Sequence, residues 1–328
     1  MFIKRDTRKV PEILVDEDDS RKELKLGRRE AEFGGSTEML LRPANAARLA
    51  NLEYLSLYHN KLARLDHFET LCDCTALTGL NLGNNAISAL PAAIGDLASL
   101  RRLWVEDNCL GELPDEVCRL EKLELLEASG NAIVRLPASI GSLLSLKELS
   151  VEGNRITELP AGLCALTGLE ALLLRGNCLT SLPADLGKLE SLKELHVNSN
   201  RLTGLPDSLG RCSKLTHLIA NGNLIASVPA SLAVLDSLEE VNLAHNKLAA
   251  LPAALTARWA GALSSIIPAT PPPSSAAAAA AASPATAGAP SQPTLLLIGN
   301  PIAGTGSSFS ASQMSQPLVQ QIQQGTVG

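Results

Sequence analysis

Seven cysteines are the side chains most able to do chemistry in this sequence, as metal ligands, nucleophiles or disulfide partners. They are Cys72, Cys74, Cys109, Cys118, Cys164, Cys178 and Cys212. Cys72 and Cys74 form one close pair, and neither a second pair nor paired histidines stand at zinc-ligand spacing. The odd number and the scattered positions do not suit a disulfide framework and favour a reducing compartment. We therefore expect a cytoplasmic protein with no metal and no cofactor.

Catalytic signatures are missing from the sequence, which has no glycine-rich phosphate loop, serine nucleophile elbow, HExxH motif or kinase signature set. A catalytic Cys–His pair stays open as an alternative, although Cys109 and Cys178 directly follow asparagines of a repeat described below. The formal net charge of −6 removes the broad attraction that nucleic acid requires. No apolar run approaches the length of a membrane span. These observations favour a protein that is not an enzyme, binds no nucleic acid and does not span a membrane.

Asparagines recur along the chain with a strict period. They are Asn60, Asn85, Asn108, Asn131, Asn154, Asn177, Asn200, Asn223 and Asn246, so one step of 25 residues is followed by seven steps of 23. A leucine stands eight residues before each asparagine, and Leu-Pro follows most of them at a fixed distance. The repeat reads LxxLxLxxNxLxxLPxxLGxL. Such self-similarity predicts stacked units that share one continuous core.

This repeat resembles the leucine-rich-repeat family, and specifically the intracellular 23-residue class of plant Ras-group-related proteins and an animal Ras-pathway scaffold. The resemblance implies an α/β repeat solenoid, a horseshoe with a parallel β-sheet on its concave side and short helical or irregular turns on its convex side. Each LxL segment would be a strand. The repeated asparagines would form a structural ladder, because in this family their amides bind backbone groups of the turn.

Composition and the repeat together divide the chain into six segments. We expect a flexible N-terminal arm at 1–20, an N-terminal cap or degenerate repeat at 21–50, nine leucine-rich repeats at 51–259, a disordered Pro/Ala/Ser-rich insertion at 260–293, a closing repeat fragment at 294–302 and a disordered tail at 303–328. The insertion includes seven consecutive alanines and offers no apolar surface to bury.

Alternation along each strand turns a second set of side chains outward, in columns that run across the repeats. The outward residues that could bind a partner are Tyr54, Tyr58, Arg102, Trp104, Glu106, Glu127, Glu148, Glu152, Leu173, Arg175, His196 and His217. Trp104 is the leading candidate because aromatics make up 2% of the chain, and a tryptophan lying flat on its neighbours is the alternative. His217 stands between Glu194 and Glu240, which indicates either a pH-sensitive contact or a solvated charged face.

The resemblance implies an intracellular scaffold in signal transduction, which binds a protein partner such as a small GTPase, a phosphatase catalytic subunit or a kinase. A structural or assembly component of cytoskeleton or cilium, or a phosphatase-regulator-like protein, is the alternative. It is suggested by the longer first repeat at residues 60–75, which lacks proline. Partner choice depends on the outward columns, which do not transfer between family members.

Overall fold

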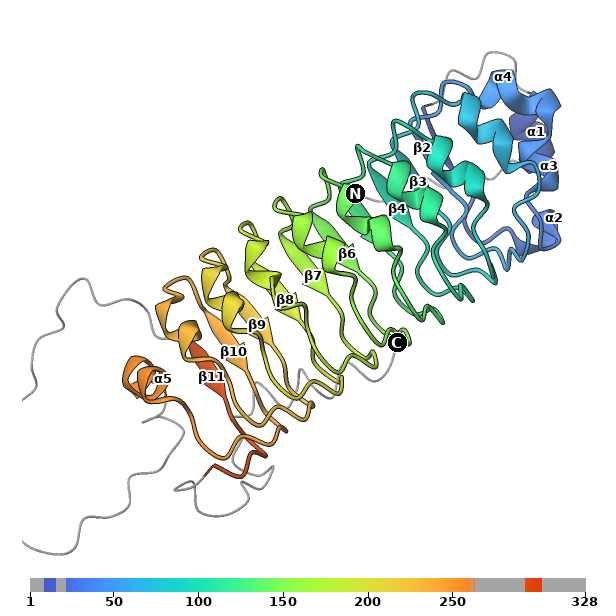
Figure 1. Cartoon of the computed structure of the whole chain (residues 1–328). Helices are drawn as coiled ribbons and strands as arrows, with labels where there is room; N and C mark the ends of the chain where they lie inside the picture. The colour runs from blue at the N-terminus through green and yellow to red at the C-terminus, as the bar shows by residue number, and fades with distance from the viewer. Residues whose placement is uncertain (1–8, 16–21, 261, 263–292, 303–328) are drawn as a thin grey trace, which may run out of the picture.

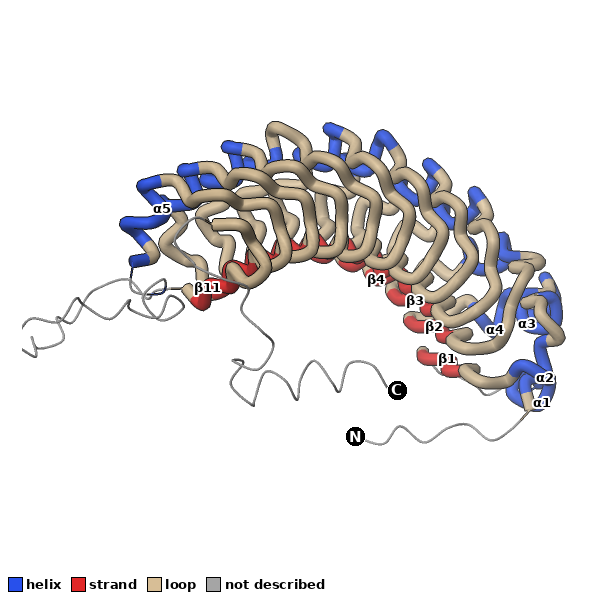
Figure 2. The backbone as a smooth tube through the Cα atoms, turned by 90° about the horizontal axis from the view of Figure 1, so that it is seen from below, coloured by secondary structure: helices blue, strands red, loops and turns tan. Residues whose placement is uncertain are grey.

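One parallel sheet runs through the whole length of the arch. The computed structural model describes residues 9–15, 22–260, 262 and 293–302, and within them eleven strands follow one another in sequence order. The strands are β1 (Glu23–Lys25), β2 (Tyr54–Ser56), β3 (Gly79–Asn81), β4 (Arg102–Trp104), β5 (Leu125–Glu127), β6 (Glu148–Ser150), β7 (Ala171–Leu173), β8 (Glu194–His196), β9 (His217–Ile219), β10 (Glu240–Asn242) and β11 (Thr294–Leu296). They line the concave side, while the helices lie on the convex side (Figures 1 and 2). The predicted horseshoe is confirmed.

The register of the sheet is the same at every strand pair. Tyr54 on β2 pairs with Gly79 on β3, which pairs with Arg102 on β4, and the equivalent residue continues the row through β10. Neighbouring strands of a sheet lie about 4.8 Å apart. Outward side chains at equivalent positions of successive repeats are therefore close neighbours, and the predicted columns are real rows on the surface.

Short 3-10 helices form most of the convex side. They are η2 (Phe68–Asp73), η3 (Ala92–Asp96), η4 (Asp115–Arg119), η5 (Ala138–Ser142), η6 (Ala161–Ala165), η7 (Leu186–Lys188), η8 (Asp207–Arg211) and η9 (Ala230–Val234). A proline directly precedes six of them in an extended conformation, as Pro91 does before η3 with φ −69° and ψ 149°. Proline suits this position because its fixed φ stops the preceding strand side and its missing N–H is not needed.

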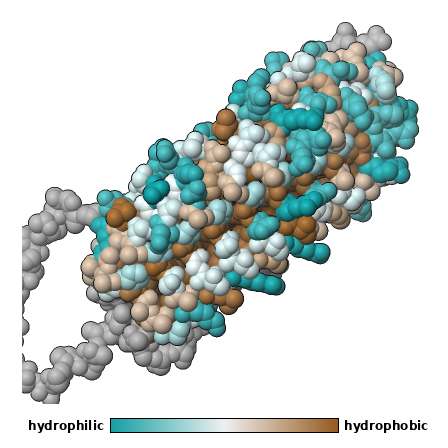
Figure 3. Space-filling view, in the orientation of Figure 1, coloured by the Kyte–Doolittle hydropathy of each residue, from teal (hydrophilic) through white to brown (hydrophobic). Residues whose placement is uncertain are grey.

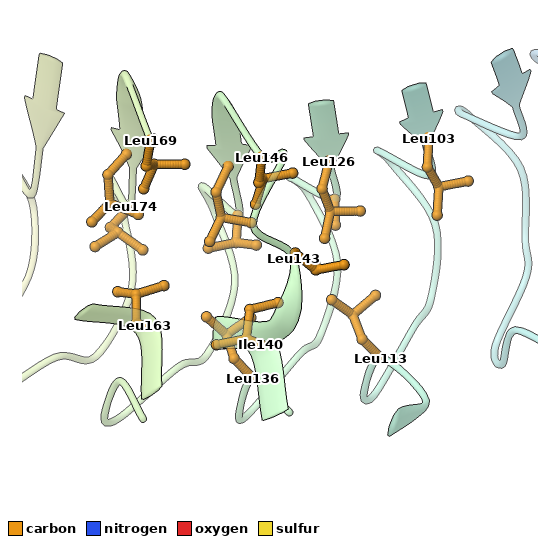
Figure 4. Close-up of a cluster of buried hydrophobic side chains, with 14 of the residues drawn as sticks. Leu103, Leu113, Leu126, Leu136, Ile140, Leu143, Leu146, Leu163, Leu169 and Leu174 are labelled. Atoms are coloured by element: carbon orange, nitrogen blue, oxygen red, sulfur yellow. The ribbon is translucent and has the colours of Figure 1, made fainter. Parts of the chain in front are cut away.

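The core between the two layers is built mainly from leucine, with valine and isoleucine. Leu103, Leu126 and Leu149 point inward from successive strands and are fully buried, as is Ile140 on the convex helix η5. Figure 4 shows these aliphatic side chains stacking from repeat to repeat between strand and turn. Each repeat thus buries its apolar face against its two neighbours. On the outside, a band of hydrophobic residues follows the long axis between hydrophilic ones (Figure 3).

The repeated asparagines satisfy backbone groups inside the turns. Asn154 is 6% exposed, and its Nδ2 donates to the carbonyls of Ala128 and Val151, both at 3.0 Å. Its Oδ1 accepts the N–H of Ile133 at 2.9 Å. The other eight make equivalent bonds, and Asn300 adds a tenth member through the carbonyl of Leu243 at 2.8 Å. Each amide therefore links one repeat to the repeat before it.

The residue before each ladder asparagine has a left-handed backbone. Five of these positions are glycines, namely Gly130, Gly153, Gly176, Gly222 and Gly299, and the other five are His59, Asn84, Asp107, Ser199 and His245. Their φ angles lie between 51° for Asp107 and 76° for Gly299. Glycine adopts this conformation without strain, whereas the other residues do so at a cost. The turn geometry is thus imposed by the repeat rather than by the local residue.

Helical segments pack around the N-terminal end of the sheet. They are α1 (Val10–Val15), α2 (Glu30–Phe33), α3 (Glu38–Leu41), η1 (Pro43–Asn45) and α4 (Ala46–Leu49). The helix α1 falls within the segment expected to be a flexible arm, and the N–H of Val10 donates to Glu32 Oε2 at 2.7 Å. The remaining residues of that segment, 1–8 and 16–20, lie outside the described residues.

The C-terminal end differs from the other repeats on its convex side. An α-helix, α5 (Ala253–Arg258), replaces the 3-10 turn, and Trp259 directly after it is 1% exposed. The strand β11 then pairs with β10. The insertion expected at 260–293 falls almost entirely outside the described residues, as does the tail at 303–328.

Candidate binding surface on the concave sheet

The twelve candidate residues lie in three adjacent rows on the concave side. Tyr54, Arg102, Glu148 and His217 belong to the first row, Trp104, Glu127, Leu173 and His196 to the second, and Tyr58, Glu106, Glu152 and Arg175 to a third row just beyond the strands. All twelve are partly or fully exposed. Ser56 and Ser150, which also occupy the second row, are buried at 8% and 3% exposure. Small side chains in the rows are therefore covered by larger neighbours.

Two aromatic rings meet over the third strand. The ring centroids of Tyr54 on β2 and Trp104 on β4 are 6.1 Å apart, with an interplanar angle of 80°. Gly79 on β3 lies between them, and a Cβ added there would be 2.7 Å from Tyr54 Cδ2 and 3.7 Å from Trp104 Cζ3. The absence of a side chain at Gly79 thus allows the rings to meet edge to face. Trp104 stays half-buried rather than fully covered.

A cation flanks each ring of this aromatic pair. The Lys25 ammonium lies 5.3 Å from the centroid of the Tyr54 ring, and the Arg102 guanidinium carbon lies 5.9 Å from that of Trp104. Lys25 also contacts Glu23 Oε2 at 2.5 Å. Cations at these distances from a ring centroid are attracted to the ring's electron-rich face. The four side chains form one array across β1, β2 and β4.

Glu106 follows the strand that carries Trp104 and lies over bare backbone. A Cβ added to Gly83 would be within 2.7 Å of the Glu106 carboxylate, so the carboxylate occupies the space that a side chain would fill. Its Oε2 atom is buried and has no hydrogen-bond partner among the described residues. Burial raises the pKa of Glu106, and the negative charges of Glu127 and Asp107 raise it further. The ionised carboxylate is therefore held in an unfavourable place.

Further carboxylates continue the surface toward the middle of the sheet. Glu127 pairs in register with Trp104, and its Oε1 accepts the N–H of Ser129 at 2.9 Å. Burial raises the pKa of Glu148 above its ordinary value, and the charges of Glu127 and Glu194 add to the shift. These carboxylates thus repel one another on a single rigid sheet.

The candidate histidines lie at the other end of the surface, on β8 and β9. His217 stands in register between Glu194 and Glu240, as the sequence predicted. Its Nδ1 lies 2.9 Å from Thr216 Oγ1, and the ion pairs found among the described residues do not include it. The register pairs His196 with Ile219. In the described part of the chain, neither ring belongs to a group of three His, Cys, Asp or Glu side chains that could hold a metal ion.

Family models and solved structures match the repeat pattern closely. A model described as a leucine-rich repeat region matches residues 33–172, and a second model, leucine rich repeat, matches residues 144–202 and 190–248. A leucine-rich-repeat protein of Leptospira interrogans superposes with a TM-score of 0.64 at 28% identity, over 79% of this chain and 58% of that one. This chain is a leucine-rich-repeat solenoid. The match does not extend to the Ras-group-related class that the sequence suggested.

Two further proteins resemble the solenoid over part of their own length. The ectodomain of the plant receptor kinase GASSHO1/SCHENGEN3 from Arabidopsis thaliana, in complex with CASPARIAN STRIP INTEGRITY FACTOR 2, has a TM-score of 0.59 at 31% identity and shares 66% of this chain and 27% of that one. Mouse leucine-rich repeat and calponin homology domain-containing protein 1 is 38% identical over 26% of this chain. The solenoid spans 12% of that mouse protein.

Sequence reasoning missed some residues of the concave surface. Lys25 was not named, because its segment was read only as an imperfect half-repeat, although the Leu24-Lys25-Leu26 motif has the strand pattern. The close approach of Tyr54 to Trp104 was also missed, and the glycine between them was the available signal. The place of Lys25 requires knowing that β1 belongs to the same sheet, whereas the aromatic contact requires knowing how side chains on β2 and β4 lie over β3.

Beside the strands, charged side chains of successive repeats alternate in sign and form ion pairs that support the register. Arg101 pairs with Glu124, and Lys193 with Glu170 at 2.5 Å. Lys147, the central cation, instead donates to the carbonyl of Gly168 at 3.3 Å. Exposed pairs of this kind contribute only about 0.2–1 kcal/mol each.

The cysteines of the solenoid mostly occupy packing positions. Burial raises the pKa of Cys74 and of Cys212 to about 11 in each case, which keeps both thiols protonated at neutral pH. Cys109 is exposed. Among the described residues, no three His, Cys, Asp or Glu side chains gather as a metal site would need. In the same part of the chain, no helix has the length and apolar character to cross a membrane.

Proposed function

We propose that this protein is a non-catalytic scaffold of intracellular signal transduction, which holds a protein partner on its concave sheet around Trp104. The Tyr54–Trp104 pair carries the proposal, because it presents aromatic area, with ring centroids 6.1 Å apart across the intervening strand β3 of a rigid sheet. Aromatic residues and arginine dominate the energetic centres of protein interfaces. Rigid presentation also lowers the entropy lost on binding. A small GTPase, a phosphatase catalytic subunit or a kinase is the partner class that the family resemblance suggests.

The structural neighbours support a binding role in general terms. The GASSHO1/SCHENGEN3 ectodomain is seen in complex with CASPARIAN STRIP INTEGRITY FACTOR 2, and the FLRT2 leucine-rich repeats belong to an octameric complex with Latrophilin 3 and Unc5D. These partners are those of the two neighbouring proteins and are not assigned to this chain. What carries over is the use of a leucine-rich-repeat fold as a docking surface.

The alternative of a cytoskeletal or ciliary assembly component rested on the longer first repeat. In the structure Asp66, at the position that proline takes in the next repeat, has a use within the fold: Ser36 Oγ donates to Asp66 Oδ2 at 2.5 Å, and Thr37 Oγ1 donates to the Asp66 carbonyl at 2.8 Å. Asp66 thus anchors the segment that leads into α3. Because these contacts give the missing proline a reason within the fold, we keep the signalling scaffold as the proposal.

Comparative affinity capture tests the proposed site. The tagged full chain, Trp104→Ala and Asn221→Ala would be compared for capture of the same partner from cell lysate, with quantitative binding to that partner afterwards. Trp104→Ala should weaken binding by about 2 kcal/mol or more. Asn221 is an outward residue at the far end of the third row, so Asn221→Ala should bind like wild type. Equal binding by all three chains, with folding verified by circular dichroism, would remove Trp104 from the site.

A further inference from the structure

The concave surface carries a marked excess of negative charge. From β2 to β10 its three rows hold six acidic side chains and two basic ones: Glu106, Glu127, Glu148, Glu152, Glu194 and Glu240 against Arg102 and Arg175. On the edge strand β1, Glu23 and Lys25 pair with each other. None of the six carboxylates belongs to an ion pair among the described residues. The surface is thus acidic as a whole, and the described part of the chain does not neutralise these six charges.

The carboxylates just beside the strands behave differently. Glu124 is paired with Arg101, Glu170 with Lys193 and Glu53 with Lys22. Carboxylates that flank the strands therefore have cations as partners, while the six outward carboxylates from β2 to β10 have none among the described residues. Folding alone does not account for this distribution, since unneutralised like charges on one sheet are destabilising.

The carboxylate whose ionised form is placed least favourably, that of Glu106, lies next to the aromatic pair. Glu106 Oε2 is buried without a hydrogen-bond partner among the described residues. Like charges at Glu127 and Asp107, together with burial, raise the pKa of Glu106. Glu127 is also the register partner of Trp104, so a single bound side chain can reach the indole ring and a carboxylate together. An aromatic face beside carboxylates attracts guanidinium and ammonium groups strongly.

We propose that the occupant of the concave sheet is a protein segment rich in arginine or lysine, whose basic side chains lie between Trp104 and the carboxylates of Glu127 and Glu148. This inference rests on the proposed scaffold function and names the chemistry of its partner. Charge complementarity carries it: the surface has six carboxylates without an ion-pair partner among the described residues, and a basic segment would supply the missing cations. An acidic segment or a nucleic acid would be repelled by the same charges.

Fluorescence anisotropy with defined peptides tests the charge preference. The probes are a fluorescein-labelled peptide of alternating arginine and serine, and the same peptide with glutamate in place of each arginine. The chains are the full-length wild type, Glu127→Gln/Glu148→Gln on the concave sheet, and Glu121→Gln/Glu158→Gln at exposed positions off the sheet. Both double variants change the net charge equally, so they separate a local site from general attraction.

The wild type should bind the arginine peptide and not the glutamate peptide. Glu127→Gln/Glu148→Gln should weaken arginine-peptide binding at least about tenfold and flatten its salt dependence, whereas the control pair should change it less than about twofold. Equal weakening by both pairs, or none by either, would overturn the proposal.

A parallel measurement separates this inference from the proposed function. If a captured partner depends on Trp104 but binds Glu127→Gln/Glu148→Gln as well as wild type, the scaffold stands and the basic partner is overturned. If the arginine peptide depends on the carboxylates while no captured partner depends on Trp104, the basic site stands and the Trp104-centred scaffold is overturned.

Discussion

Tyr54 and Trp104 come from strands that are not neighbours, yet their rings meet edge to face with centroids 6.1 Å apart. Contact across an intervening strand is possible because Gly79 on that strand has no side chain, and a Cβ there would be 2.7 Å from the tyrosine ring. The glycine thus joins two outward aromatic residues into one surface feature. The contact has consequences for stability as well as for binding.

A double-mutant cycle should detect the contact between the two rings. Tyr54→Ala, Trp104→Ala and the double variant should show a coupling energy of about 0.5–1.5 kcal/mol in urea denaturation, because each single change already removes the shared edge-to-face contact. A cycle between Tyr58 and Trp104 is the matched control, since the ring next to Tyr58 is His59, at 6.0 Å. Strict additivity for Tyr54 and Trp104 would show that the rings do not interact in solution.

The contribution of the asparagine ladder to stability should be measurable by replacing a single asparagine. Asn154→Ala removes an amide that serves the carbonyls of Ala128 and Val151 and the N–H of Ile133. Leaving these groups unpaired in the interior should lower the free energy of unfolding by roughly 1–3 kcal/mol. Asn198→Ala, at a half-buried outward position, should be close to neutral. A similar thermal shift for both variants would argue against a special role for the ladder.

Removing one complete repeat should leave a shorter folded solenoid. Deleting residues 123–145 takes out β5 and η5, and joins two repeats whose strands and turns have the same register. Contacts in a solenoid are between nearest neighbours, so the new junction should reproduce the old one. Circular dichroism and a cooperative thermal transition would verify this. Deleting only half a repeat, residues 123–134, should unfold the protein, because it breaks the register between the strands on either side.

Most of the fold could be predicted from sequence because the repeat fixes it. The spacing of the asparagines predicted the strand register from Tyr54 to Glu240 without error, since a solenoid repeats one local geometry. The additional edge strand β1 was harder to see, because Leu24 and Leu26 lie in a degenerate copy. The exposure of single outward residues depends on neighbours in other repeats. Ser150 is 3% exposed and its Oγ lies 2.8 Å from Ser129 Oγ, which periodicity alone does not reveal.

Replacing Glu106 should stabilise the protein at neutral pH. Burial raises the pKa of this carboxyl, so the folded chain binds its proton more tightly than the unfolded chain does. Between the unfolded and the folded pKa values the unfolded state has released more protons, and the free energy of unfolding therefore falls as the pH rises through that window. Glu106→Gln abolishes this cost and should raise the melting temperature at pH 7 by roughly 1–3 °C.

The pH dependence distinguishes this cause from a simple packing change. The gain from Glu106→Gln should shrink as the pH is lowered and vanish below about 4.3, the pKa of a glutamate in an unfolded chain, because the wild-type carboxyl is then protonated in both states. Glu121→Gln removes the same charge from an exposed position and should change the melting temperature little at any pH. A lower melting temperature for Glu106→Gln at pH 7 would mean that the ionised carboxylate stabilises the fold. In that case its position beside Trp104 would reflect packing rather than the recognition of a cation.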